Sequence, residues 1–66
     1  MNIQIKVDCE SPSDLHTALN ELKRAIRQHC KKNKINPLTA EFEVGTYLET
    51  NNCYGSIDME VLKEEE

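Results

Sequence analysis

The spacing of apolar residues changes from two to three or four and back to two along this chain, and this change limits the fold more than any other feature. Residues 2–9 alternate, with Ile3, Ile5 and Val7 on one face, which predicts a strand with one buried face. Residues 12–33 have a helical spacing. The predicted apolar stripe of this helix consists of Leu15, Ala18, Leu19, Leu22, Ile26 and Cys30.

Both ends of the helix carry sequence signals. Ser11 is a favourable N-cap, Pro12 suits the first helical position, and Asp14 places a negative charge near the positive end of the helix dipole. We therefore expect the helix to begin at Pro12. Asn36-Pro37 ends any helix, because proline lacks the amide proton and pushes the preceding residue toward extended geometry.

From residue 38 to residue 49 the period of two returns, which predicts a second strand. Asn51-Asn52 resembles a two-residue turn, and residues 56–62 alternate again as a third strand. A turn at this place pairs residues whose numbers add up to 103. The predicted pairs are Leu48 with Gly55, Thr46 with Ile57, Val44 with Met59, Phe42 with Val61 and, on the other face, Glu43 with Glu60.

These elements predict an α+β fold, a single two-layer β-α-β-β domain over residues 1–62 with an acidic frayed tail at 63–66. The helix packs on one face of a three-stranded sheet and leaves the other face open. The right-handed crossover rule makes the first and second strands parallel, with the third antiparallel to the second. Which strand lies in the middle is left open.

Composition predicts a small cytoplasmic protein. The 66 residues carry a net charge of -4 and no apolar run of the length that a membrane span or a signal peptide needs. Cys9, Cys30 and Cys53 are odd in number, which argues against a disulfide framework and for a reducing compartment. We interpret them as small buried hydrophobes. A contact between Cys9 and Cys53 is an alternative if the first and third strands are neighbours.

The sequence does not favour catalysis. Its two glycines, Gly45 and Gly55, fall inside predicted strands rather than in a phosphate-binding loop. The cysteines and the two histidines, His16 and His29, are spread over both ends of the helix and do not suggest a shared zinc site. We therefore expect no enzymatic activity, no cofactor and no metal.

Charge is unevenly distributed along the chain. Residues 1–22 carry -3, residues 23–34 carry +6 with no acid, and residues 35–66 carry -7. Five of the six cations in the middle segment fall within an arc of roughly 100° on the helix side away from the apolar stripe. This arc predicts a candidate nucleic-acid-binding surface, with solvation of an exposed helix face as the plain alternative. Its members are Lys23, Arg24, Arg27, Lys31 and Lys34.

The open sheet face is expected to be acidic and to expose both tyrosines of the chain. Tyrosine is common at protein interfaces, because it buries much area at a small entropic cost. An acidic face with tyrosines is suited to a basic protein surface. An ordinary solvated face is again the alternative. The candidate partner-binding residues are Glu41, Glu43, Tyr47, Tyr54, Asp58 and Glu60.

Three functional hypotheses follow. The first is a protein-binding module that inhibits or adapts a partner protein by covering its surface, as small anti-CRISPR inhibitors from phages and mobile elements do. The second is a nucleic-acid or ribosome-associated protein that uses the basic helix. The third is a homodimer in which strand edges pair across a two-fold axis.

Overall fold

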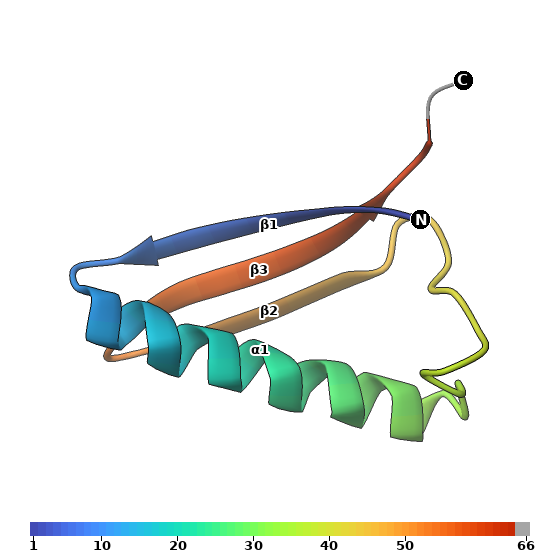
Figure 1. Ribbon diagram of the computed structural model, residues 1–66, viewed down its shortest axis with the longest axis horizontal. Helices are drawn as coiled ribbons and strands as arrows, with labels where there is room; N and C mark the ends of the chain where they lie inside the picture. Colours follow the sequence, from blue (N-terminus) through green and yellow to red (C-terminus); the bar gives the residue numbers. More distant parts are fainter. Residues whose placement is uncertain (65–66) are drawn as a thin grey trace.

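The computed structural model describes residues 1–64, and its elements follow the predicted order. Strand β1 spans Asn2–Cys9, helix α1 spans Pro12–Lys32, strand β2 spans Tyr47–Asn52 and strand β3 spans Gly55–Leu62. The strands form one sheet with α1 along one face and the other face open (Figure 1). The predicted α+β fold is therefore confirmed. Within residues 1–64, no helix combines the length and apolar character that crossing a membrane requires.

β3 is the central strand of the sheet, which settles the strand order that the sequence left open. The order is β1-β3-β2, and β3 pairs antiparallel with both neighbours. β1 and β2 therefore run in the same direction, as predicted, but they are not adjacent. Because β1 and β2 are the outer strands, each has one edge whose backbone groups are not paired within the sheet.

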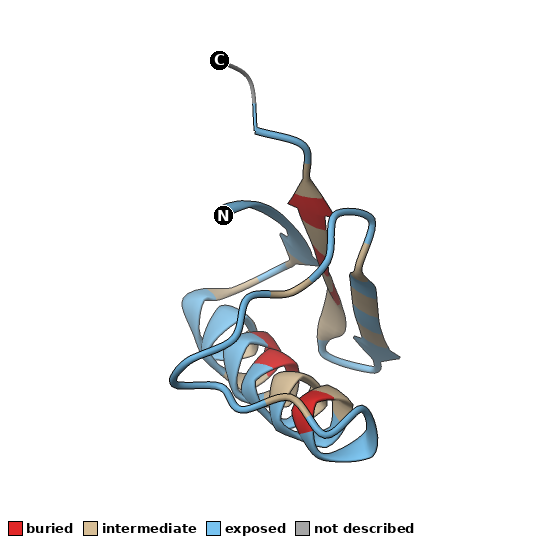
Figure 2. Cartoon of the chain, turned by 90° about the vertical axis from the view of Figure 1, so that its right-hand side faces the viewer, coloured by how far each residue is buried: buried red, intermediate tan, exposed pale blue. Residues whose placement is uncertain are grey.

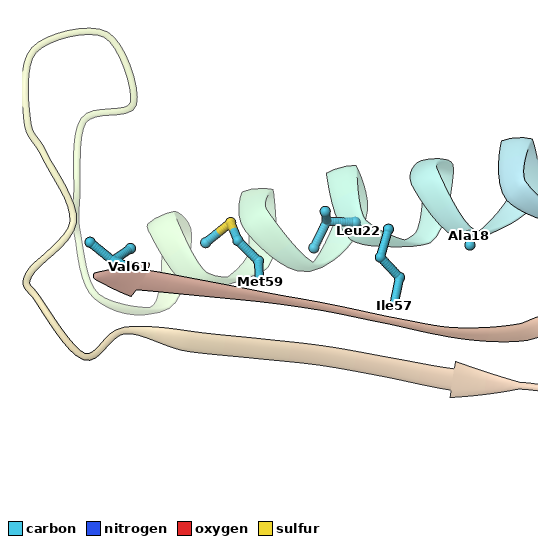
Figure 3. Packing of buried hydrophobic residues seen from close by; sticks show 5 residues of the cluster. All are labelled: Ala18, Leu22, Ile57, Met59 and Val61. Atoms are coloured by element: carbon cyan, nitrogen blue, oxygen red, sulfur yellow. The ribbon is translucent and has the colours of Figure 1, made fainter. Parts of the chain in front are cut away.

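The core lies between α1 and β3. Ile57, Met59 and Val61 alternate along β3 and point toward the helix, where Ala18 and Leu22 meet them (Figure 3). All five side chains are buried, and Phe42, Ile26 and Leu48 pack against them at the margin. The helical period of α1 and the two-residue period of β3 thus produce one shared apolar layer.

Both ends of α1 are capped. The Ser11 hydroxyl accepts a hydrogen bond from the Asp14 amide at 3.1 Å, so the predicted N-cap and start at Pro12 are confirmed. After Asn33, Lys34 adopts a left-handed conformation with φ of 56°. The Ile35 amide donates to the Cys30 carbonyl at 2.9 Å, and the Lys34 amide donates to the Lys31 carbonyl at 3.4 Å. This is the Schellman arrangement, with lysine at the position that usually holds glycine.

The predicted register of the β2–β3 hairpin is wrong. The turn is Cys53-Tyr54 rather than Asn51-Asn52, and paired residues add up to 107, as in Leu48 with Met59 and Tyr47 with Glu60. The cause is local, because the Asn52 side chain accepts a hydrogen bond from the Tyr54 amide at 2.9 Å and thereby opens a turn after itself. Glu60 therefore does not lie opposite Glu43.

The second strand is also shorter than predicted, because residues 38–46 precede β2 as an irregular segment. The Asn36 side chain accepts from the Leu38 amide at 3.0 Å and its carbonyl accepts from the Ala40 amide at 3.0 Å, which folds the chain into a turn. Gly45, predicted inside a strand, takes a left-handed φ of 93°. Leu38 and Val44 remain exposed despite their alternating positions.

Of the predicted tail at 63–66, the structure describes Lys63 and Glu64. Lys63 and Glu64 are exposed, and the Glu64 carboxylate pairs with the amino group of Met1. Residues 65–66 lie outside the described residues. The domain bounds of 1–62 and 63–66 stay a prediction.

Candidate protein-binding surface

The open sheet face is an acidic surface built by all three strands. Directly paired residues in an antiparallel ladder point to the same side, so the register gives the rows across this face. One row holds Lys6, Asp58 and Glu49, and the next holds Gln4, Glu60 and Tyr47. A third row consists of Asp8, Ser56 and Asn51. Four carboxylates and one lysine thus share this face.

Two of these carboxylates are direct cross-strand neighbours. Glu49 lies opposite Asp58, and such like-charge pairs oppose sheet formation by a few tenths of a kcal/mol to about 1 kcal/mol. Lys6 lies on the other side of Asp58 and offsets part of this repulsion. The predicted pair of Glu43 with Glu60 is thus replaced by Glu49 with Asp58. A cationic partner group placed between Glu49 and Asp58 would relieve the same repulsion.

Tyr47 is fixed on this face by a hydrogen bond. Its hydroxyl donates to Glu49 Oε2 at 2.8 Å, and half of the residue's surface is exposed. Because ionisation of the phenol would break this bond and add a negative charge beside Glu49 and Asp58, the pKa of Tyr47 rises from 10.0 to about 12. The ring is therefore a neutral, oriented contact within an acidic surrounding.

The predicted partner-binding residues do not all lie together. Tyr47, Asp58 and Glu60 share the open face with Glu49. Glu41 and Glu43 lie in the segment before β2, where they line a hollow of about 330 Å³ with His29 and Asn33 at the end of α1. Tyr54 lies in the hairpin turn and lines a hollow of about 470 Å³ with Cys9 and Asp14. The open face thus contains three of the six predicted residues.

The five predicted basic residues are all exposed on the α1 side of the molecule. Lys23, Arg24, Arg27 and Lys31 belong to the helix, and Lys34 follows it in the left-handed turn. Within residues 1–64, the only acid paired with this group is Glu21, whose carboxylate lies 3.8 Å from Arg24. The open sheet face and the outer helix face therefore carry opposite charge on opposite sides of the two-layer fold.

The cysteines differ from one another in exposure. Cys30 is buried as predicted, Cys9 is half-buried, and Cys53 is exposed in the hairpin turn, which contradicts its assignment as a buried hydrophobe. Cys9 and Cys53 line one hollow at the same end of the sheet, far from Cys30. Among residues 1–64, no three His, Cys, Asp or Glu side chains are arranged to hold a metal ion.

The apolar side of β1, which the sequence predicted to be buried, forms a second exposed surface. Ile3, Ile5 and Val7 point to the helix side of the sheet, yet they are 38%, 48% and 39% exposed. The reason is that α1 contacts β2 and β3 more than β1, and β1 is exposed along most of its length (Figure 2). Only the strand order, which the sequence left open, could have revealed this.

Two helix residues extend this apolar surface. Leu15 and Leu19 are as exposed as the β1 residues and lie on the same side of α1 as Ile26 and Cys30. Those two line a hollow with Met1, the residue that precedes β1. We call the combined surface the β1 strip; its members are Ile3, Ile5, Val7, Leu15 and Leu19.

Comparisons with known proteins identify no relative. No protein-family model matches the chain, and no curated protein or solved structure shows significant similarity to it.

Proposed function

We propose that this chain is a non-enzymatic protein-binding module of the cytoplasm, which inhibits or adapts a partner by covering a basic surface with its open sheet face. The observation that carries this proposal is the cluster of Tyr47, Glu49, Asp58 and Glu60 on two paired strands. The cluster combines a neutral aromatic ring with three carboxylates on a rigid sheet. The free thiols of Cys9, Cys30 and Cys53 suit a reducing compartment.

The chemistry of the face selects the kind of partner. Nucleic acid is repelled by four carboxylates, whereas lysine and arginine side chains of a protein gain charge-assisted hydrogen bonds there. The half-exposed Tyr47 ring supplies the apolar contact that a purely charged face lacks. A partner that presents a nucleic-acid-binding surface fits this description, and covering that surface would inhibit it. A phage or mobile-element inhibitor of a host nuclease would act in this way.

The test is capture of partners from the native cytosol by the tagged chain, after nuclease treatment, with a double variant of the face. In Glu49→Lys with Glu60→Lys, each new cation lies beside a carboxylate or a polar neighbour of the sheet, so the fold should be retained. We expect the stoichiometric partner to be lost. Tyr47→Ala should weaken capture without changing the net charge.

A matched control separates the face from net charge. Glu41→Lys with Glu43→Lys changes the net charge by the same amount, but these residues lie beside the end of α1. We expect this variant to capture the partner as the original chain does. Equal loss in both double variants, or no loss in either, would contradict the proposal.

The exposed basic face of α1 favours a second candidate function, binding of nucleic acid. Five exposed cations, with one acid contact at Arg24 in the described part of the chain, form a surface suited to phosphates. The substitution Lys23→Glu with Arg27→Glu and Lys31→Glu tests it. Nucleic acid that is retained by the original chain at low salt, and is lost in this variant, would establish that function instead.

A further inference from the structure

β1 is an outer strand without the features that usually prevent strand edges from pairing. It is eight residues long, contains no proline, and keeps one unbroken register with β3 from Asn2 opposite Leu62 to Cys9 opposite Gly55. Lys6 is its one lysine, and it points to the open face. Natural edges are commonly short, bulged or covered. An edge of this length and regularity is suited to accept another strand.

The apolar side of the same strand is also uncovered. Five side chains of the β1 strip, each about 40% exposed, leave on the order of 350 Å² of apolar surface, which is comparable to the largest exposed patch of a typical monomer. A strand added to the β1 edge would lie beside β1, and its side chains on the helix side would border this apolar surface. It should therefore contribute apolar side chains at alternate positions.

The β1 sequence itself meets this requirement. In an antiparallel pair of two copies centred on Ile5, Ile5 lies opposite Ile5 of the second copy, and Ile3 lies opposite Val7 of the second copy. All these residues point to the helix side. On the open side, Lys6 lies opposite Gln4 of the second copy and Asn2 lies opposite Asp8 of the second copy. This register places no like charges opposite each other.

Other symmetric registers are worse. A pair centred on Lys6 places two lysines directly opposite each other. Pairs centred on Gln4 or Val7 include fewer residues of Asn2–Cys9. Pairs centred between two residues place apolar side chains opposite polar ones, because the side of each residue alternates. The charges of facing residues, the number of paired residues and the side to which each side chain points therefore all favour the register centred on Ile5.

From this self-complementarity we infer that the chain forms a symmetric homodimer through antiparallel pairing of β1 with β1 of a second copy, centred on Ile5. The result is a continuous six-stranded sheet in which the two β1 strips adjoin on the helix side. The two acidic faces adjoin on the other side. Self-association does not require the proposed partner, so the two can be tested apart.

The primary measurement is sedimentation equilibrium of the full chain between about 1 µM and 1 mM. We expect a monomer–dimer equilibrium that Ile5→Lys abolishes, since a charge directed inward blocks edge pairing. Ile5 is 48% exposed, so a lysine there can reach water in the monomer. The matched control is Leu38→Lys, at a site that is 91% exposed and outside the β1 strip, which should dimerise normally.

Substitutions of Gln4 distinguish this register from a general effect on folding. Within one chain Gln4 lies opposite Glu60, so Gln4→Lys should stabilise the fold and Gln4→Glu should weaken it. In the dimer position 4 lies opposite Lys6 of the second copy. There Gln4→Lys should weaken association, and Gln4→Glu should strengthen it, by about twofold to thirtyfold over two symmetric contacts.

Disulfide trapping locates the two-fold axis. In a chain with Cys9→Ser and Cys53→Ser, we expect Ile5→Cys to cross-link two copies, because directly opposite Cα atoms lie about 4.5–5.5 Å apart. Lys6→Cys should not, since its own symmetry mate is a diagonal neighbour in this register. A monomer at every concentration would refute the inference. A dimer that is insensitive to the Gln4 substitutions, or that cross-links through Lys6→Cys instead, would also refute it.

Discussion

Substitution of Gly55 by alanine should remove a large part of the stability of this fold, whereas the same change at Gly45 should cost less. Both glycines have positive φ, 136° at Gly55 and 93° at Gly45. A Cβ at Gly45 meets nothing within 4 Å, so only conformational strain of about 1–2 kcal/mol applies. A Cβ at Gly55 would overlap the carbonyl oxygen of Asp8 and lie 3.1 Å from the Cβ of Cys9.

The overlap at Gly55 involves backbone, so it can be relieved only if the end of β1 moves away from β3. Backbone strain of about 1–3 kcal/mol then adds to loss of one or two ladder hydrogen bonds at about 0.5–1.5 kcal/mol each. The sum of about 1.5–6 kcal/mol is large for a chain of 66 residues, whose total stability is on the order of 3–10 kcal/mol.

Urea unfolding followed by circular dichroism measures both variants. With a slope of about 1 kcal/mol per molar for a small domain, the midpoint of Gly55→Ala should lie about 2 M below that of Gly45→Ala. Equal midpoints would show that β1 and the hairpin turn do not approach as closely as the register of Cys9 with Gly55 requires. They would also contradict the predicted overlap at Gly55.

Two further predictions concern the core and the open face. Met59→Ala should lower the free energy of unfolding by about 2–4 kcal/mol, because Met59 is 1% exposed in the central strand. Ile5→Ala, at a half-exposed site, should lower it by about 1 kcal/mol or less. Urea midpoints measured at low micromolar concentration compare the two variants. Tyr47 should titrate at about 12, seen in the ultraviolet absorption of tyrosinate. A raised pKa means that the neutral phenol is favoured in the folded state, so its stabilising effect is complete below pH 10 and is lost as the pH rises through 12. Tyr47→Phe should remove this pH dependence of the stability. A tyrosinate signal near pH 12 that this substitution leaves unchanged would contradict the assignment to Tyr47.

The helix and the side of each strand residue were predictable because they depend on local signals. Ser11 and Pro12 mark the helix start in the sequence, and both act as predicted. The hairpin register was wrong by two residues at the turn, yet Glu49 and Asp58 still lie on the open face. A turn displaced by an even number of residues changes every cross-strand partner but keeps each side chain on its side.

What could not be predicted depends on contacts between distant segments. The alternation from Leu38 to Val44 indicates a strand, but the hydrogen bonds of Asn36 and the left-handed Gly45 fold these residues into turns. Glu41 and Glu43 therefore do not lie on the open face, where the sequence placed them. The assignment of Ile3 and Ile5 to the core failed for another reason, since their pattern gives the side of the strand and not how much of that side is covered.

The exposure of β1 follows from the dimensions of the fold. An α-helix with its side chains is about 10–12 Å wide, and strands lie about 4.8 Å apart, so one helix covers little more than two strands. α1 packs mainly on β2 and β3 and buries the core residues of β3 almost completely, and β1 is left without a covering layer. A chain with one helix cannot supply that layer from its own residues. In the proposed dimer, pairing of two β1 strands would remove the open edge and join the apolar strips, which would account for alternating Ile3, Ile5 and Val7 on a strand that its own helix does not cover.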